Sequence, residues 1–143
     1  MAEKLEQAGV GVSYFSLLKR GLDLEMPDGR LIKNAEFTID PEPVKSYGYC
    51  SDTLYDENYF DAIKECDTLY HEATFLHEML ERANQTHHTT AFQAAEVARI
   101  TRARKLLIGH FSSRYKTLQP FLDEARSVFP DTDLAVEGRT FAI

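Results

Sequence analysis

From residue 44 onward the sequence predicts an α/β fold, because extended and helical stretches alternate along it with short connections. Extended runs are expected at residues 44–50, 68–71, 105–110 and 133–137. Helical runs are expected at residues 58–65, 76–83, 91–104 and 118–129. The first 43 residues lack this alternation, so we divide the chain into an irregular segment, 1–43, and an α/β region, 44–143.

Within the irregular segment the pattern predicts only short elements. Two amphipathic stretches are expected, at residues 3–7 and 14–19, and a turn is expected at Pro27-Asp28-Gly29. The alternation of Ala35, Phe37 and Ile39 predicts a strand.

In the α/β region the helix starts are the best-defined features. Thr90 and Gln93 have the spacing of a capping box, and a mostly apolar side follows them in the helix expected at residues 91–104. Pro120 suits the first turn of the helix expected at residues 118–129, where its missing amide proton costs nothing.

The composition is that of a globular protein. A chain of 143 residues with 43% hydrophobic and 27% charged residues has the size of one domain. Neither a signal peptide nor an apolar run of about 18 residues is present, so we expect a cytoplasmic protein without membrane contact. A net charge of −7 argues against a surface coated in nucleic-acid-binding charge but permits a local basic groove. Cys50 and Cys66 lack CxxC spacing and are expected to be reduced and partly buried.

Polar side chains follow three of the expected strands. Asp52, Glu72 and His110 each fall at or just after a strand end. In open α/β sheets the functional crevice lies beyond the carboxyl ends of the strands. His88 precedes the capped helix, whose N-terminus and free amides can face the same space and attract a phosphate. The sequence therefore predicts a hydrolytic site for a phosphoester.

Each residue also has a simpler structural explanation. Asp52 suits a turn, Glu72 a helix start, and His110 the edge of the sheet. His77 and His87 are interpreted as surface residues rather than ligands. The functional interpretation depends on the combination of residues.

Four strings in order carry a family resemblance: SDT at 51–53, HEATF at 71–75, HTTAFQAA at 88–95 and HFSSRY at 110–115. Over residues 44–137 they resemble the C-terminal half of ribonuclease Z, the tRNA 3′-processing endonuclease family of the metallo-β-lactamase superfamily. The resemblance implies half of an αββα sandwich, with a mixed sheet and flanking helices. It also likens residues 1–43 to the exit of the family's tRNA-binding arm, although GVGVSY stands at 9–14 where that arm often carries a glycine-proline motif.

The resemblance implies a role for each site residue. Asp52 would bridge two zinc ions and His110 would bind one of them. His88 would be the catalytic residue that assists the leaving 3′ oxygen, with Glu72 orienting it, and Arg114 would contact the scissile phosphate of precursor tRNA.

The sequence contains no HxHxDH motif, the family's main metal-binding motif. Catalytic zinc usually has three protein ligands plus water, so we expect this chain alone to be inactive or nearly so. A half-sandwich also leaves an apolar sheet face exposed, so we expect a homo-oligomer such as a homodimer. The alternative is a non-catalytic α/β module that retains the motifs for dimerisation or partner binding. Hydrolysis of a small ester or lactam is disfavoured by the HEATF and HTT strings.

Overall fold

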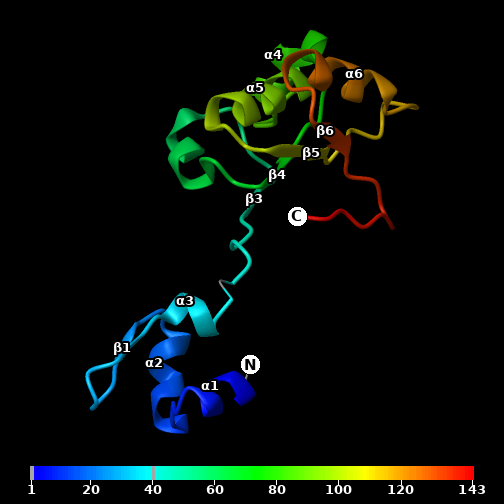
Figure 1. Cartoon of the computed structure of the whole chain (residues 1–143). Helices are drawn as coiled ribbons and strands as arrows, with labels where there is room; N and C mark the ends of the chain where they lie inside the picture. The colour runs from blue at the N-terminus through cyan, green and yellow to red at the C-terminus, as the bar shows by residue number, and fades with distance from the viewer. Residues whose placement is uncertain (1, 40) are drawn as a thin grey trace. The chain divides into compact units, whose positions relative to one another are not determined.

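The computed structural model describes residues 2–39 and 41–143. The chain divides into two compact units, Met1–Pro43 and Val44–Ile143. Figure 1 labels helices and strands of both units. Among the described residues, no helix has both the length and the apolar character needed to span a membrane.

The second unit contains one four-stranded sheet. Its strands are β3 (Tyr47–Cys50), β4 (Thr68–Glu72), β5 (Lys105–Gly109) and β6 (Thr132–Leu134), in the order β3-β4-β5-β6. All three pairings are parallel, which confirms the predicted α/β fold but differs from the mixed sheet that the resemblance implies. The pairings are parallel because helical crossovers, rather than hairpins, join the successive strands.

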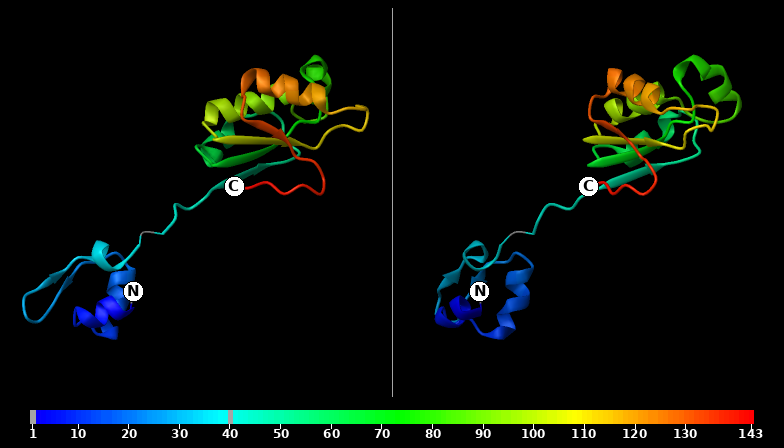
Figure 2. Two further views of the ribbon diagram at one scale, coloured as in Figure 1. Left: turned by 45° about the vertical axis from the view of Figure 1, so that its right-hand side comes forward. Right: turned by 90° about the vertical axis from the view of Figure 1, so that its right-hand side faces the viewer.

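The helices of this unit lie between the strands in sequence. They are η2 (Glu57–Ile63), η3 (His77–Met79), α4 (Leu80–Gln85), α5 (Ala91–Thr101) and α6 (Gln119–Val128). Right-handed crossovers between strands in sequential order bring the connecting helices to one face of the sheet. Figure 2 shows α5 and α6 side by side on that face. Helix α5 ends before the predicted residue 104 because Arg102 takes a left-handed conformation, with φ of 57°.

The core lies between α5, α6 and the sheet. Small side chains of α5 let the helix approach the sheet closely, and the core is completed by larger side chains that are fully buried: Leu69, Val97, Leu106, Ile108 and Phe121. Cys66 is buried and Cys50 half-buried, and both are free thiols as predicted.

The other face of the sheet carries a row of tyrosines. Tyr49 is 64% exposed and stacks on Tyr70, with ring centroids 4.7 Å apart and planes 13° apart. Tyr47 continues the row, with its ring centroid 6.4 Å from that of Tyr49. Position 109, beneath the Tyr70 side chain, requires glycine, because a Cβ there would lie 2.6 Å from the Tyr70 hydroxyl.

The first unit has its own small core. Helices α1 (Ala2–Gln7), η1 (Val12–Tyr14), α2 (Phe15–Lys19) and α3 (Asn34–Phe37) surround a hairpin of β1 (Leu24–Glu25) and β2 (Leu31–Ile32). Six apolar side chains are buried together: Leu5, Val10, Leu18, Leu24, Met26 and Ile32. The hairpin turn coincides with the predicted turn at residues 27–29.

The strand predicted from Ala35, Phe37 and Ile39 is wrong. Residues 34–37 form the helical turn α3 instead. The carboxylate of Asp23 accepts a hydrogen bond from the N–H of Asn34 at 2.7 Å, and the Asn34 side chain donates to the carbonyl of Leu18. These contacts with α2 and the loop after it favour a turn over an isolated strand.

Candidate functional site

The site lies at the carboxyl edge of the four-stranded sheet. Cys50, His71 and Ile108 are paired across β3, β4 and β5, so the residues that follow them emerge side by side. Asp52 and His110 both take the left-handed conformation, with φ of 48° and 61°. That conformation is uncommon for residues other than glycine, and such strain is concentrated at functional sites.

Glu72 is the buried centre of the site. Its side chain is fully buried at the end of β4. Its Oε1 accepts hydrogen bonds from the N–H of Thr53 at 3.1 Å and from Nδ1 of His88 at 2.8 Å. Its Oε2 accepts from the N–H of Thr74 at 3.1 Å and from the Thr74 hydroxyl at 2.6 Å. One carboxylate therefore organises the loops after β3 and β4 and the loop before α5.

The His88 loop is fixed from a second direction. The Thr89 hydroxyl donates to the carbonyl of Thr53 at 2.5 Å, which joins this loop to the Asp52 loop. A parallel bridge pairs Phe75 with Thr90. The predicted capping box is confirmed, because the Thr90 hydroxyl accepts from Gln93 N–H and the Gln93 side chain accepts from Thr90 N–H.

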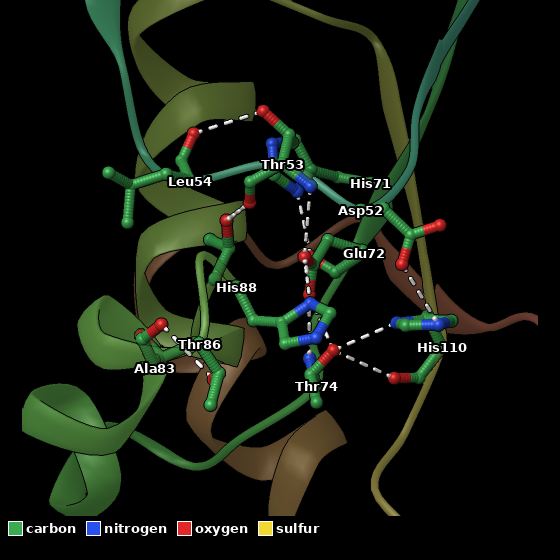
Figure 3. Close-up of polar contacts among 12 residues, drawn as sticks. Asp52, Thr53, Leu54, His71, Glu72, Thr74, Ala83, Thr86, His88 and His110 are labelled. Atoms are coloured by element: carbon green, nitrogen blue, oxygen red, sulfur yellow. Dashed lines mark hydrogen bonds and ion pairs between the residues drawn. The ribbon is translucent and has the colours of Figure 1, made fainter.

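His110 is fixed by its contacts with Thr74 and Asp52. Its Nδ1 lies 2.9 Å from the Thr74 hydroxyl, and its Nε2 lies 3.2 Å from Oδ1 of Asp52. The His88 and His110 rings are neighbours, with centroids 5.3 Å apart. Figure 3 shows the imidazoles of His88 and His110 and the Asp52 carboxylate grouped around Glu72.

Asp52, His88 and His110 form a group that can hold a metal ion. One ligand atom from each lies within 4.8 Å of the others. An imidazole-and-carboxylate set with three protein members matches the ligands of catalytic zinc. Glu72 behind His88 has the place of the carboxylates that orient metal-binding histidines. The donor chemistry therefore fits a divalent transition metal.

The predicted phosphate site at the start of α5 is wrong. The N–H of Phe92 donates to Oε1 of Glu124 at 2.9 Å, and the N–H of Ala91 donates to the carbonyl of Phe75. Gln93 N–H is taken by the cap. Because a carboxylate of α6 already occupies this helix terminus, its first amides are not free for an anion.

The remaining residues considered from the sequence are Arg114, His87 and His77. Arg114 is exposed on the loop after His110, with its guanidinium carbon 5.2 Å from the centroid of the Phe75 ring, which in turn lies 6.2 Å from the His88 ring. His87 is exposed as predicted. His77 is not a free surface residue, because it is half-buried and its Nδ1 lies 3.1 Å from the Thr90 hydroxyl.

Three threonines of the site were not predicted from the sequence. Thr53, Thr74 and Thr89 supply the hydroxyl and backbone contacts described above, and each falls inside one of the four strings. Their position within two residues of Asp52, Glu72 and His88 was the only available indication, because the contacts of Thr53, of Thr89 and of Thr74 with His110 join different loops.

Sequence comparison finds relatives that are named ribonuclease Z. The chain is 49% identical to ribonuclease Z of Cytophaga hutchinsonii over 129 residues, which is 88% of this chain and 41% of that protein. It is 45% identical to ribonuclease Z of Porphyromonas gingivalis over 128 residues, 90% of this chain and 42% of that protein. The chain thus spans about two fifths of the length of the curated relatives it matches.

The fold comparison points to the metallo-β-lactamase fold. The crystal structure of the metallo-β-lactamase fold protein YhfI from Bacillus subtilis matches with a TM-score of 0.61 and 21% identity, covering 66% of this chain and 39% of YhfI. No family model matches the sequence. The structural likeness supports the fold assignment, and the sequence identities show similarity to part of ribonuclease Z.

Proposed function

The chain is homologous to part of ribonuclease Z over about nine tenths of its own length, and from this premise we propose that it supplies one wall of a metal-dependent endoribonuclease site acting at the 3′ side of precursor tRNA. The observation that carries the proposal is the group of Asp52, His88 and His110 at three loop positions, with ligand atoms within 4.8 Å. The group is not a chance placement, because the Glu72 carboxylate accepts hydrogen bonds from the Thr53 N–H and from Nδ1 of His88 and so holds their two loops together.

Zinc is the proposed metal. Asp52 and His110 would hold it, and Asp52 would be shared between two ions in the complete site. Two zinc ions supply a hydroxide nucleophile near neutral pH and stabilise the oxygens of an in-line displacement at phosphorus. Because a two-metal site needs more ligands than this group offers, the chain alone should be inactive or nearly so.

His88 is proposed to deliver a proton to the leaving 3′ oxygen. Its Nδ1 is held by the buried Glu72 carboxylate, and the imidazole is 23% exposed, so the opposite ring nitrogen can reach a substrate. A proton donor must present its proton on the ring nitrogen that faces the leaving oxygen. The same nitrogen can serve as a metal ligand, and the substitutions below distinguish these roles.

Arg114 is proposed to contact the scissile phosphate. The planar guanidinium suits a phosphate oxyanion, and its place over Phe75 keeps it on the His88 side of the site. Residues 1–43 are proposed to correspond to the exit of the tRNA-binding arm, as a unit distinct from the catalytic wall. A cytoplasmic location and a homodimer complete the proposal.

Complementation tests the proposal. The chain is mixed with the part of the ribonuclease Z of Cytophaga hutchinsonii that lies outside the aligned region, with zinc and a precursor tRNA. Cleavage at the 3′ side is expected in the mixture but not with either part alone. Asp52→Ala should abolish it, whereas His87→Ala, which changes an exposed neighbouring histidine, should not.

His88→Ala separates the two roles of that residue. If His88 is the proton donor, His88→Ala should abolish cleavage and leave zinc binding by the mixture unchanged. If His88 is a metal ligand, the substitution should abolish both. A folded mixture that binds zinc but never cleaves the RNA would overturn the nuclease proposal. Stable association of the two parts without cleavage would then favour the alternative, a non-catalytic partner-binding module.

A further inference from the structure

We infer that Thr74 is a positioning residue that passes the charge of Glu72 to His110 and thereby fixes which ring nitrogen of His110 faces the metal group. The importance of that nitrogen rests on the proposed function, but the hydrogen bonding does not.

Both carboxylate oxygens of Glu72 accept hydrogen bonds. Two backbone N–H groups, of Thr53 and Thr74, point at its two oxygens and can only donate. Nδ1 of His88 lies 2.8 Å from Oε1. Since an ionised carboxylate only accepts hydrogen bonds, Nδ1 of His88 carries a proton and its Nε2 is the nitrogen left for chemistry.

The Thr74 hydroxyl has one proton and three polar neighbours. Oε2 of Glu72 lies at 2.6 Å, the carbonyl oxygen of His110 at 3.0 Å and Nδ1 of His110 at 2.9 Å. The short contact with a charged acceptor takes the proton, since charge-assisted hydrogen bonds are the stronger ones. If the proton pointed at His110 Nδ1 instead, two oxygen lone pairs would face each other at 2.6 Å.

His110 must therefore donate to Thr74. With the hydroxyl proton committed to an oxygen, the Thr74 oxygen presents a lone pair to Nδ1, and Nδ1 of His110 carries the ring proton. The Nε2 lone pair is then directed toward Asp52, whose Oδ1 is 3.2 Å away. Two acceptors facing each other at this distance favour a cation shared between them.

One carboxylate thus sets the tautomers of both imidazoles. It acts directly on His88 and through a hydroxyl on His110, and Thr74 is 6% exposed, which shields this relay from water. Partners behind metal-binding histidines raise ligand basicity, and their loss typically weakens metal binding roughly 10- to 100-fold.

The test reads the tautomer directly, on the metal-free 143-residue chain. Asp52→Ala is introduced first, because the Asp52 carboxylate would otherwise compete for a proton on Nε2. Long-range ¹H–¹⁵N NMR, recorded above the pH range in which histidine titrates, should report a proton on Nδ1 of His110. Sedimented protein gives the same shifts by magic-angle spinning if the chain self-associates. A proton on Nε2 in this single variant would overturn the inference without any change at Thr74.

Substitutions of Thr74 complete the test. Thr74→Val removes the hydroxyl at nearly constant shape and should transfer the proton to Nε2, whereas Thr74→Ser should leave it on Nδ1. In the chain with Asp52 intact, Thr74→Val should weaken zinc binding at least tenfold and Thr74→Ser by much less. Failure of all variants to bind zinc would count against the proposed function, while an Nδ1 proton retained in Thr74→Val would count against the relay alone.

Discussion

The Thr89 hydroxyl lies 2.5 Å from the carbonyl oxygen of Thr53, so that a single hydrogen bond joins two loops 36 residues apart in sequence. Thr89 is fully buried. Asp52 precedes Thr53 and His88 precedes Thr89, so this contact sets the distance between two proposed functional side chains.

Thr89→Val should loosen this connection. It keeps the shape of the side chain but leaves the Thr53 carbonyl without its partner, which should lower the free energy of unfolding by about 1–2 kcal/mol. Urea denaturation measures the change, and isothermal titration with zinc should show weaker binding. Thr89→Ser retains the hydroxyl and is the control, so equal losses in both variants would mean that the methyl packing, not the hydrogen bond, fixes the loops.

Glu72→Gln should be more damaging than its small chemical change suggests. The amide nitrogen of glutamine would face N–H donors wherever it is placed, because all four contacts of Glu72 are with donors. Hydrogen bonds to charged groups are worth about 1.5–3 kcal/mol, so a loss of about 2–3 kcal/mol in unfolding free energy is expected.

The matched control is Glu78→Gln on η3, an exposed glutamate. Surface substitutions of this kind usually stay within about 0.5 kcal/mol. A Glu72→Gln variant as stable as this control would contradict the central role given to the carboxylate.

Features coded by neighbouring residues could be predicted from the sequence. The capping box of Thr90 and Gln93 and the buried run of β5 depend on residues a few positions apart, and both were predicted correctly. The helical turn at residues 34–37 was missed because it depends on Asp23, 11 positions away. The amides at the start of α5 were misjudged because Glu124, 32 positions away, occupies one of them.

In the candidate site, too, only part could be predicted from the sequence. The family strings indicated Asp52, His88 and His110, whose ligand atoms prove to lie together. The contact of Thr74 with His110 joins residues 36 positions apart, and no local pattern encodes it.

His71 should make stability depend on pH. It is fully buried on β4, donates from Nδ1 to the Glu72 carbonyl at 2.7 Å, and accepts at Nε2 from the Tyr59 hydroxyl at 2.9 Å. Burial lowers the pKa of His71 below its ordinary value of 6.5. Above pH 6.5 His71 is neutral in the folded and in the unfolded chain. Below pH 6.5 the unfolded chain takes up a proton at His71 and the folded chain does not, so the free energy of unfolding falls as pH decreases.

The expected loss from His71 between pH 7.5 and pH 5.5 is about 1 kcal/mol. Urea denaturation at the two pH values measures it. His71→Gln should lower stability at both but reduce the difference between them, whereas His87→Gln, at an exposed position, should leave the difference unchanged. A pH dependence that persists in His71→Gln would assign the effect to other histidines.

The tyrosine row should make the chain self-associate through the helix-free face of its sheet. Tyr49 is 64% exposed although it stacks on Tyr70, and burying an aromatic side chain of this kind contributes about 1.5–3 kcal/mol. Tyr49→Thr keeps a residue suited to a strand and removes the ring, so the dissociation constant of the assembly should rise at least about tenfold. Sedimentation velocity over a range of concentrations measures this. Val44→Thr, at a position 94% exposed and outside β3, should have no such effect. Equal weakening by both substitutions would show that association does not depend on the tyrosine row. A wild-type chain that stays monomeric would show that this face is stable in water.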